Sequence, residues 1–331
     1  MATNDFLVFG GGAGANVITQ VTYSGLAART AGFSAGVAQS AQLNKVWRQS
    51  SIMSAVLAQF VSDLTGQDVL DDGTTTTILA NLKAAVSAQS IGVVGAVRNA
   101  KMSVTAASAS ATFTADEVVV ESALGGKAYR LPSVNKAINL ATTGAGGMDA
   151  GTAPNSGYVA LYAIYNPATG ASALLARNAT SAVQPEVYGG VNMPVGYTAS
   201  ALVSVWPTNA SGQFKIGYQR GRSVNFPLAT LLSTSTTTGT NTALSVAGAI
   251  PPNAVSMGGE MSVQNGSVVT TAIAVSADAN PVGQNAISSS AAALMLANYQ
   301  VPIITPQTVY YTATAASGTP VFTLYTSWYS F

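Results

Sequence analysis

The chain has 331 residues, of which 48% are hydrophobic and only 8% are charged, and its formal net charge is +1. Soluble domains usually carry about 25% charged residues, so this surface has to rely on uncharged polar side chains or lose area to self-association. The net charge argues against a nucleic-acid partner, and the absence of Cys and His removes thiolate nucleophiles, disulfides, the usual general base and the commonest transition-metal ligand.

Residues 1–90 are predicted to form a helical unit behind an extended arm. The apolar run Phe6–Phe9 followed by glycines is typical of an extended segment that enters a loop. Further on, apolar residues recur at alternating steps of three and four, which predicts a helix with a heptad-type stripe that stops at Gly66. The stripe comprises Leu43, Val46, Met53, Leu57, Phe60 and Leu64, with Ser50 at the remaining position. It suits packing against a second helix, against symmetry-related copies, or both.

A second helix is predicted after a turn at Asp71–Gly73. A threonine run leads into it, and Ile78, Leu79, Leu82 and Val86 fall on one of its faces. The two helices together predict a helical hairpin.

From about residue 91 the pattern changes to short strands separated by Gly, Pro and Asn. Tyr158–Tyr165 carries apolar side chains on both faces, which is typical of a central strand. The strand pattern restarts near Arg222–Pro227, so we expect two β-sandwich-like modules, 91–227 and 228–331. After Arg222 only Glu260 and Asp278 are charged, and the last module is rich in Thr and Ser.

The first residues show no basic start followed by an apolar run, so no signal peptide is predicted. No apolar run approaches the roughly 18 residues of a membrane-spanning helix. We therefore expect synthesis in the cytoplasm and no insertion into a membrane.

Two motifs resemble ligand sites but favour simpler interpretations. Gly10–Ala15 superficially matches a dinucleotide-binding loop, yet no regular βαβ alternation follows and no acidic residue stands about 20 positions later. An arm that docks into another protein is favoured there. The acidic segment Asp68–Gly73 lacks the ligand spacing of a calcium loop and is predicted to be a turn with local hydrogen bonds.

Asp116, Glu117 and Glu121 form the other acidic cluster. Glycoside hydrolysis needs two carboxylates across a cleft, about 5–10 Å apart, whereas these residues suit the solvated edge of an ordinary strand. We therefore predict no catalytic residues, no metal site and no cofactor.

Aromatic residues gather near residue 331 and suggest contacts with sugars, because aromatic faces suit the C–H surfaces of pyranoses. Strand alternation places Phe322, Leu324 and Trp328 toward the core. Tyr325 and Tyr329 then lie on the opposite face, and they are the predicted receptor-binding residues.

Several stretches resemble tail-fibre proteins of phages and prophages of Gram-negative bacteria. They are FSAGVAQSAQLNKVWRQS (Phe33–Ser50), GQDVLDDGTTTTILANLKAAV (Gly66–Val86), LATTGAGGM (Leu140–Met148), SGYVALYAIYNPATGASALLA (Ser156–Ala176) and GYTASALVSVWPT (Gly196–Thr208). The resemblance covers most of residues 1–220; the last 109 residues have no such match.

The resemblance implies a homotrimeric fibre in the virion tail. Its N-terminal part would join a tail or adaptor protein, and its distal part would bind a host surface glycan or an outer-membrane protein. The heptad stripe and the low charge are consistent with a trimer. Two alternatives stay open: a fibre that cleaves surface polysaccharide, and a purely structural virion component such as a baseplate or decoration subunit.

Overall fold

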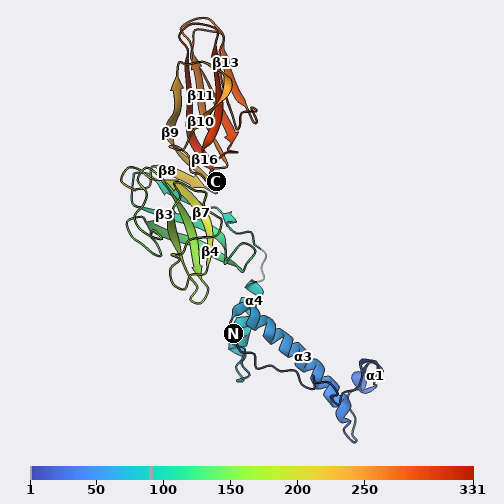
Figure 1. Ribbon diagram of the computed structural model, residues 1–331. Helices are drawn as coiled ribbons and strands as arrows, with labels where there is room; N and C mark the ends of the chain where they lie inside the picture. Colours follow the sequence, from blue (N-terminus) through green and yellow to red (C-terminus); the bar gives the residue numbers. More distant parts are fainter. Residues whose placement is uncertain (1, 89–91) are drawn as a thin grey trace. The chain divides into compact units, whose positions relative to one another are not determined.

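The computed structural model describes residues 2–88 and 92–331, and the chain divides into two compact units, residues 1–91 and 92–331 (Figure 1). The first unit is a short helical region, and the second consists of large antiparallel sheets. The mainly β fold with a helical N-terminal region that the sequence predicts is therefore confirmed.

The helices of the first unit are α1 (Gln20–Ser24), α2 (Ala28–Ala31), α3 (Ser40–Thr65) and α4 (Thr75–Ala88). The predicted stop of the long helix is confirmed: Gly66 has a left-handed φ of 68°, and its N–H donates to the carbonyl of Ser62. Among the described residues, no helix is long and apolar enough to cross a bilayer.

A small core joins α3 to α4. Its buried residues are Ala58, Val61, Val69 and Ala85, and Phe6, Leu64, Ile78 and Leu82 pack around them. The N-terminal arm adds to this unit through Asn4, which forms a parallel bridge with Val69. The start of the arm is therefore paired with its own chain, with the amide of Asp5 donating to the Val69 carbonyl at 3.0 Å.

The second unit contains the strands, which fall into two groups along the chain. The first strand group is β1 (Val97–Arg98), β2 (Lys101–Val104), β3 (Ser110–Glu121), β4 (Ala128–Asn139), β5 (Tyr158–Asn166), β6 (Ala171–Asn178), β7 (Ala199–Pro207) and β8 (Gly217–Arg220). The second strand group is β9 (Ser223–Thr234), β10 (Thr238–Ser245), β11 (Ser256–Gln264), β12 (Thr271–Ser276), β13 (Asn285–Ser289), β14 (Met295–Pro302), β15 (Thr308–Ala315) and β16 (Val321–Ser330).

In the described residues these strands form a sheet of twelve and a sheet of four. The larger sheet has the order β14-β11-β16-β9-β8-β2-β3-β7-β5-β6, with β1 and β4 also paired to β3, and the smaller sheet has the order β10-β15-β12-β13. Strand β9 links the groups, because it pairs with β8 at its start and with β16 along its length. The boundary predicted at 227/228 falls inside β9, and the division into two modules stays a prediction.

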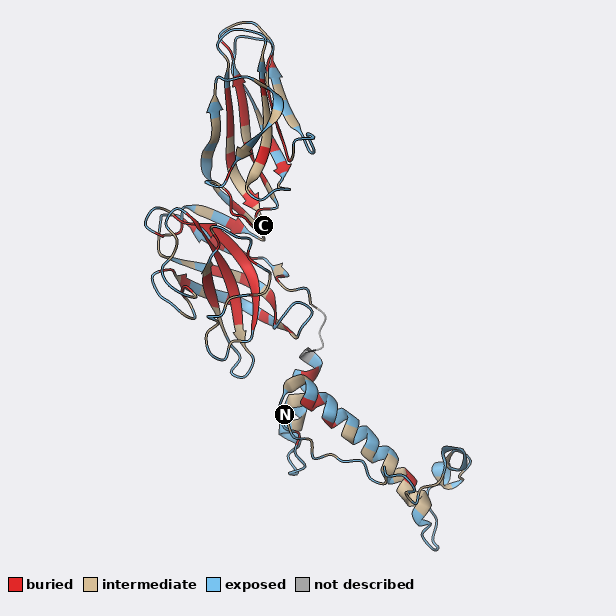
Figure 2. Ribbon diagram, viewed as in Figure 1, coloured by how far each residue is buried: buried red, intermediate tan, exposed pale blue. Residues whose placement is uncertain are grey.

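The core of the first strand group is centred on β5 and β7, whose residues are almost all buried (Figure 2). Trp206, Tyr162, Phe113 and Phe214 are the largest fully buried side chains there. The prediction that Tyr158–Tyr165 is a central strand is confirmed, because β5 is buried on both faces and lies between β6 and β7.

The second strand group buries a core between its two layers. Ile273, Val309 and Ala313 of the smaller sheet belong to the same buried cluster as Met261 and Leu324 of the larger one. Polar residues cover the outside of the smaller sheet; Thr240 and Thr242 of β10, for example, are exposed. Hydroxyl groups thus supply surface polarity where the sequence has almost no charge.

Candidate functional site

The predicted stripe on α3 is divided between the interior and the surface. Leu64 packs on the small core, and Leu43 and Val46 are half-buried. By contrast Met53, Leu57 and Phe60 are 68%, 50% and 37% exposed, and Figure 2 shows the middle of α3 largely exposed.

The exposed part of the stripe adjoins Val56, which lies one turn from Met53 and from Phe60 on α3. Trp47, Ile52 and Val56 are also exposed, although the ring of Phe9 packs edge-on against Trp47 at 5.7 Å. Contiguous exposed apolar surface usually marks an interaction site. The middle of α3 is therefore a candidate surface for association with an apolar partner.

The prediction that Tyr329 is exposed is wrong. Its side chain is fully buried, and its hydroxyl donates to the carbonyl of Val205 at 2.6 Å. Its ring lies 5.8 Å from that of Phe226. Tyr325 is half-buried, and a receptor-binding role for this residue stays a prediction.

An irregularity in β16 between Thr326 and Trp328 explains the error, because Phe322, Leu324 and Thr326 are buried before it and Tyr329 after it. The pairing of β16 with β9 shifts register between Leu324 and Tyr325 and again between Thr326 and Trp328. Such shifts change which face a following residue occupies. Phe322 and Leu324 are buried as predicted, whereas further along Tyr329 is buried and Trp328 is half-exposed.

Four loops meet at the end of the second strand group opposite Ser223 and Phe331 (Figure 1). They comprise residues 235–237, 265–270, 290–294 and 316–320, none of which is charged. Val268 and Leu294 are exposed there. These end loops offer a hydroxyl-rich and partly apolar surface for contact with a partner.

Asn265 orders two of the end loops. Its side chain is buried, its Nδ2 donates to Thr271 Oγ1 and to the Ser317 carbonyl, both at 2.9 Å, and its Oδ1 accepts from the amides of Ser267 and Thr319 at 3.1 Å. An amide that makes four hydrogen bonds has used its whole capacity. Sequence analysis did not single out Asn265, because its partners lie up to 54 residues away.

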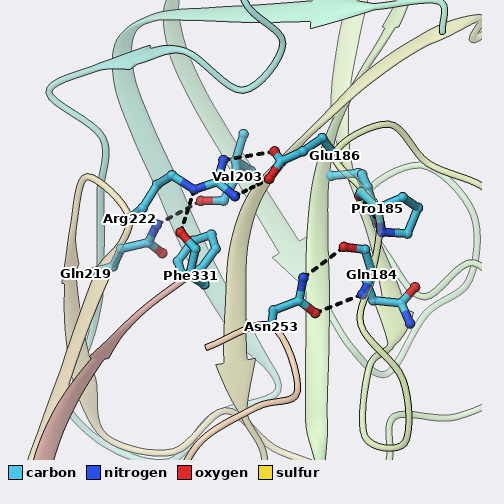
Figure 3. Close-up of polar contacts among 9 residues, drawn as sticks. Gln184, Pro185, Glu186, Val203, Gln219, Arg222, Asn253 and Phe331 are labelled. Atoms are coloured by element: carbon cyan, nitrogen blue, oxygen red, sulfur yellow. Dashed lines mark hydrogen bonds and ion pairs between the residues drawn. The ribbon is translucent and has the colours of Figure 1, made fainter. Parts of the chain in front are cut away.

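Arg222 connects three distant segments in a polar cluster (Figure 3). Its guanidinium donates to both carboxylate oxygens of Glu186 at 2.9 and 2.6 Å, and its Nε donates to the Phe331 carbonyl at 2.7 Å. It also lies 4.8 Å from the centre of the Phe331 ring. Nearby, the side chain of Asn253 exchanges two hydrogen bonds with the backbone of Gln184. The cluster joins the turn before β9 to the segment before β7 and to the end of β16.

Replacing Arg222 with Met is expected to reduce the free energy of unfolding by about 2 kcal/mol. The ion pair contributes only part of this, because the Arg222 and Glu186 side chains are 30% and 41% exposed. The remainder comes from the hydrogen bond to Phe331 and the contact with its ring. Urea unfolding measures the change.

Arg130→Met is the matched control for Arg222→Met. The Arg130 guanidinium pairs with Glu117 at 2.8 Å, but its side chain is 59% exposed, and we expect a loss of about 0.5 kcal/mol or less. Equal losses for the two variants would contradict a structural role of the Arg222 cluster.

The acidic residues have local partners. Glu117 pairs with Arg130, and Glu121 is buried and accepts the amide of Gly125 at 3.1 Å. Asp72 accepts one hydrogen bond from the hydroxyl of Thr74 and one from its amide. Both bonds lower the pKa of Asp72, and the hydroxyl has the larger effect. In the described part of the chain, no three Asp or Glu residues come together as a possible metal site.

No protein-family model matches the chain, and no curated protein matches it in sequence. The resemblance to tail-fibre proteins therefore stays a hypothesis, and the functional argument depends on the surfaces described above.

Proposed function

We propose that this protein is a non-enzymatic subunit of a phage tail fibre that attaches to the virion through residues 1–90 and binds the host cell surface through its strands. The observation that carries the proposal is the exposed apolar stripe in the middle of α3, because a single chain leaves Met53, Leu57 and Phe60 unburied. In the proposed fibre, α3 and α4 form a helical hairpin and the two strand groups are β-sandwich-like modules.

Homotrimerisation through α3 would cover this stripe. The helix has 26 residues, which corresponds to a length of about 39 Å, and its apolar positions follow the alternating spacing of a coiled-coil seam. A closed trimer also removes lateral surface from water, which suits a chain with 8% charged residues.

Host binding is proposed for the outer surfaces of the strand groups, including the end loops. These loops are uncharged, and Asn265 holds two of them in place. Weak contacts of this kind suffice when several copies act together, since multivalency multiplies modest affinities. The proposed partners are a host surface glycan or outer-membrane protein at the strands, and a tail or adaptor protein at the N-terminal arm.

A purely structural virion component is the second candidate. The burial of Tyr329 favours it, because one of the two aromatic side chains proposed to contact a receptor is part of the core.

Binding of the labelled full-length chain to a panel of Gram-negative cells separates the two candidates. We expect light scattering to give three times the chain mass of 33.3 kDa, and fluorescence to show binding to some strains that disappears when surface glycan is removed. A trimer that binds no strain would favour the structural component. A monomer at micromolar concentration would contradict the proposed assembly.

A further inference from the structure

The outer face of the first strand group carries polar side chains in register across neighbouring strands. In β8, β2, β3 and β4 the residues Arg220, Lys101, Thr114 and Asn135 are successive partners. Paired residues of antiparallel strands project from the same face, and neighbouring strands lie about 4.8 Å apart. The four side chains therefore form one polar row across the sheet.

A second polar row runs beside the first one. Asp116 of β3 and Ser133 of β4 stand two positions from Thr114 and Asn135, so strand alternation places them on the same face. Asn99 precedes β2 and completes this row, because its Nδ2 donates to Oδ2 of Asp116. The intervening residues Ala115 and Val134 are buried on the other face.

On the other side of the first row lies an exposed aromatic ring. Tyr218 of β8 is 40% exposed and pairs with the exposed Ser103 of β2. It stands two positions from Arg220, so it also belongs to the outer face. We call Asn99, Lys101, Thr114, Asp116, Asn135 and Tyr218 the polar platform.

The platform contains a hollow of about 480 Å³, lined by Asn99, Lys101, Asp116 and their row neighbours. Its size falls in the usual range of ligand sites, about 300–1,000 Å³. Asn99 and Ser133 in its lining have φ values of 54° and 51°. Such values are uncommon outside glycine and are found at binding sites more often than elsewhere.

We propose that the polar platform binds a hexopyranose unit of a saccharide. Amide, carboxylate, hydroxyl and ammonium groups supply closely spaced donors and acceptors, which match the vicinal hydroxyls of a sugar. The ring of Tyr218 lies outside the hollow and offers a face for the C–H groups of a neighbouring sugar unit. A peptide partner would favour more apolar surface than the platform offers.

The proposal rests on the host-binding part of the proposed function. It assigns the sugar contact to the outer face of β8, β2, β3 and β4 instead of to Tyr325 or Tyr329. It does not depend on trimerisation, because all platform residues belong to one chain.

Saturation-transfer NMR with the full-length protein tests the proposal. The probes are the methyl glycosides of galactose, mannose and N-acetylglucosamine, and glucuronic acid. We expect at least one to bind, with affinity about tenfold weaker for Asp116→Asn and for Lys101→Met, since each change removes a polar contact in the hollow. Asp71→Asn and Lys83→Met are the matched controls, and they should bind like the unmodified protein. Tyr325→Ala tests the other predicted receptor-binding residue.

Two results would overturn the proposal: binding of none of the probes, or binding that both platform variants retain. A loss confined to Tyr325→Ala would also overturn it. Whole-cell binding measured on the same samples distinguishes this proposal from the proposed function. Binding to cells without binding to any sugar probe would support host attachment and contradict sugar binding at the polar platform.

Discussion

Replacing Met53, Leu57 and Phe60 with serine is expected to convert the proposed trimer into a monomer. These side chains are exposed in the single chain, so their main stabilising effect would come from burial between copies. Burying a large apolar side chain contributes about 1.5–3 kcal/mol when complete, and a trimer repeats each contribution three times. Light scattering across a dilution series measures the loss of association.

The matched control replaces Val191 and Val195 with serine. These side chains are 96% and 100% exposed but lie outside the stripe, so the trimer should persist. Leu57 also lines a hollow of about 140 Å³ beside Phe6, and its replacement can loosen the helical unit. A second variant, Met53→Glu, places a charge at the most exposed stripe position and keeps Leu57. If it stays trimeric while circular dichroism shows intact helices, the seam is not on this face of α3.

The sequence alone predicts those features of the fold that depend on residues close together in the chain. The heptad spacing and Gly66 predict the extent of α3, and apolar residues on both faces predict the buried strand β5. Local spacing carries this information because a helix repeats every 3.6 residues and a strand every two.

Features that depend on pairing between distant segments could not be predicted in this way. The register shift between Thr326 and Trp328 reverses the expected orientation of Tyr329, and the local alternation of residues does not predict it. The polar platform also requires β2 to pair with β8, more than 100 residues later. Arg222 and Phe331, separated by 109 residues, meet for the same reason.

Raising the pH above 10 is expected to destabilise the second unit strongly. Burial raises the pKa of Tyr129, raises that of Tyr188 to about 12, and raises the pKa of Tyr158, Tyr162, Tyr299 and Tyr329 higher still. An unfolded tyrosine ionises near pH 10. Between that pH and the folded pKa the native state holds more protons than the unfolded state, so stability falls as the pH rises.

The size of the effect follows from the number of groups. Each tyrosine that stays protonated only in the folded state lowers the free energy of unfolding by up to about 1.4 kcal/mol per pH unit. Several such groups approach the whole stability of a typical domain, about 5–15 kcal/mol. Urea unfolding at a series of pH values from about 8 to about 11 measures the slope. A midpoint that stays constant over this range would contradict the burial of these hydroxyls.

Tyr329→Phe identifies the contribution of one group. At neutral pH the variant should be less stable by about 1 kcal/mol, because the Val205 carbonyl loses the hydrogen bond that the hydroxyl donates at 2.6 Å. Above pH 10 its stability should fall less steeply than that of the unmodified protein, since one ionisable hydroxyl is missing. The two curves are therefore expected to converge as the pH rises. Parallel curves would show that Tyr329 ionises equally in the folded and unfolded states, which is incompatible with a fully buried hydroxyl.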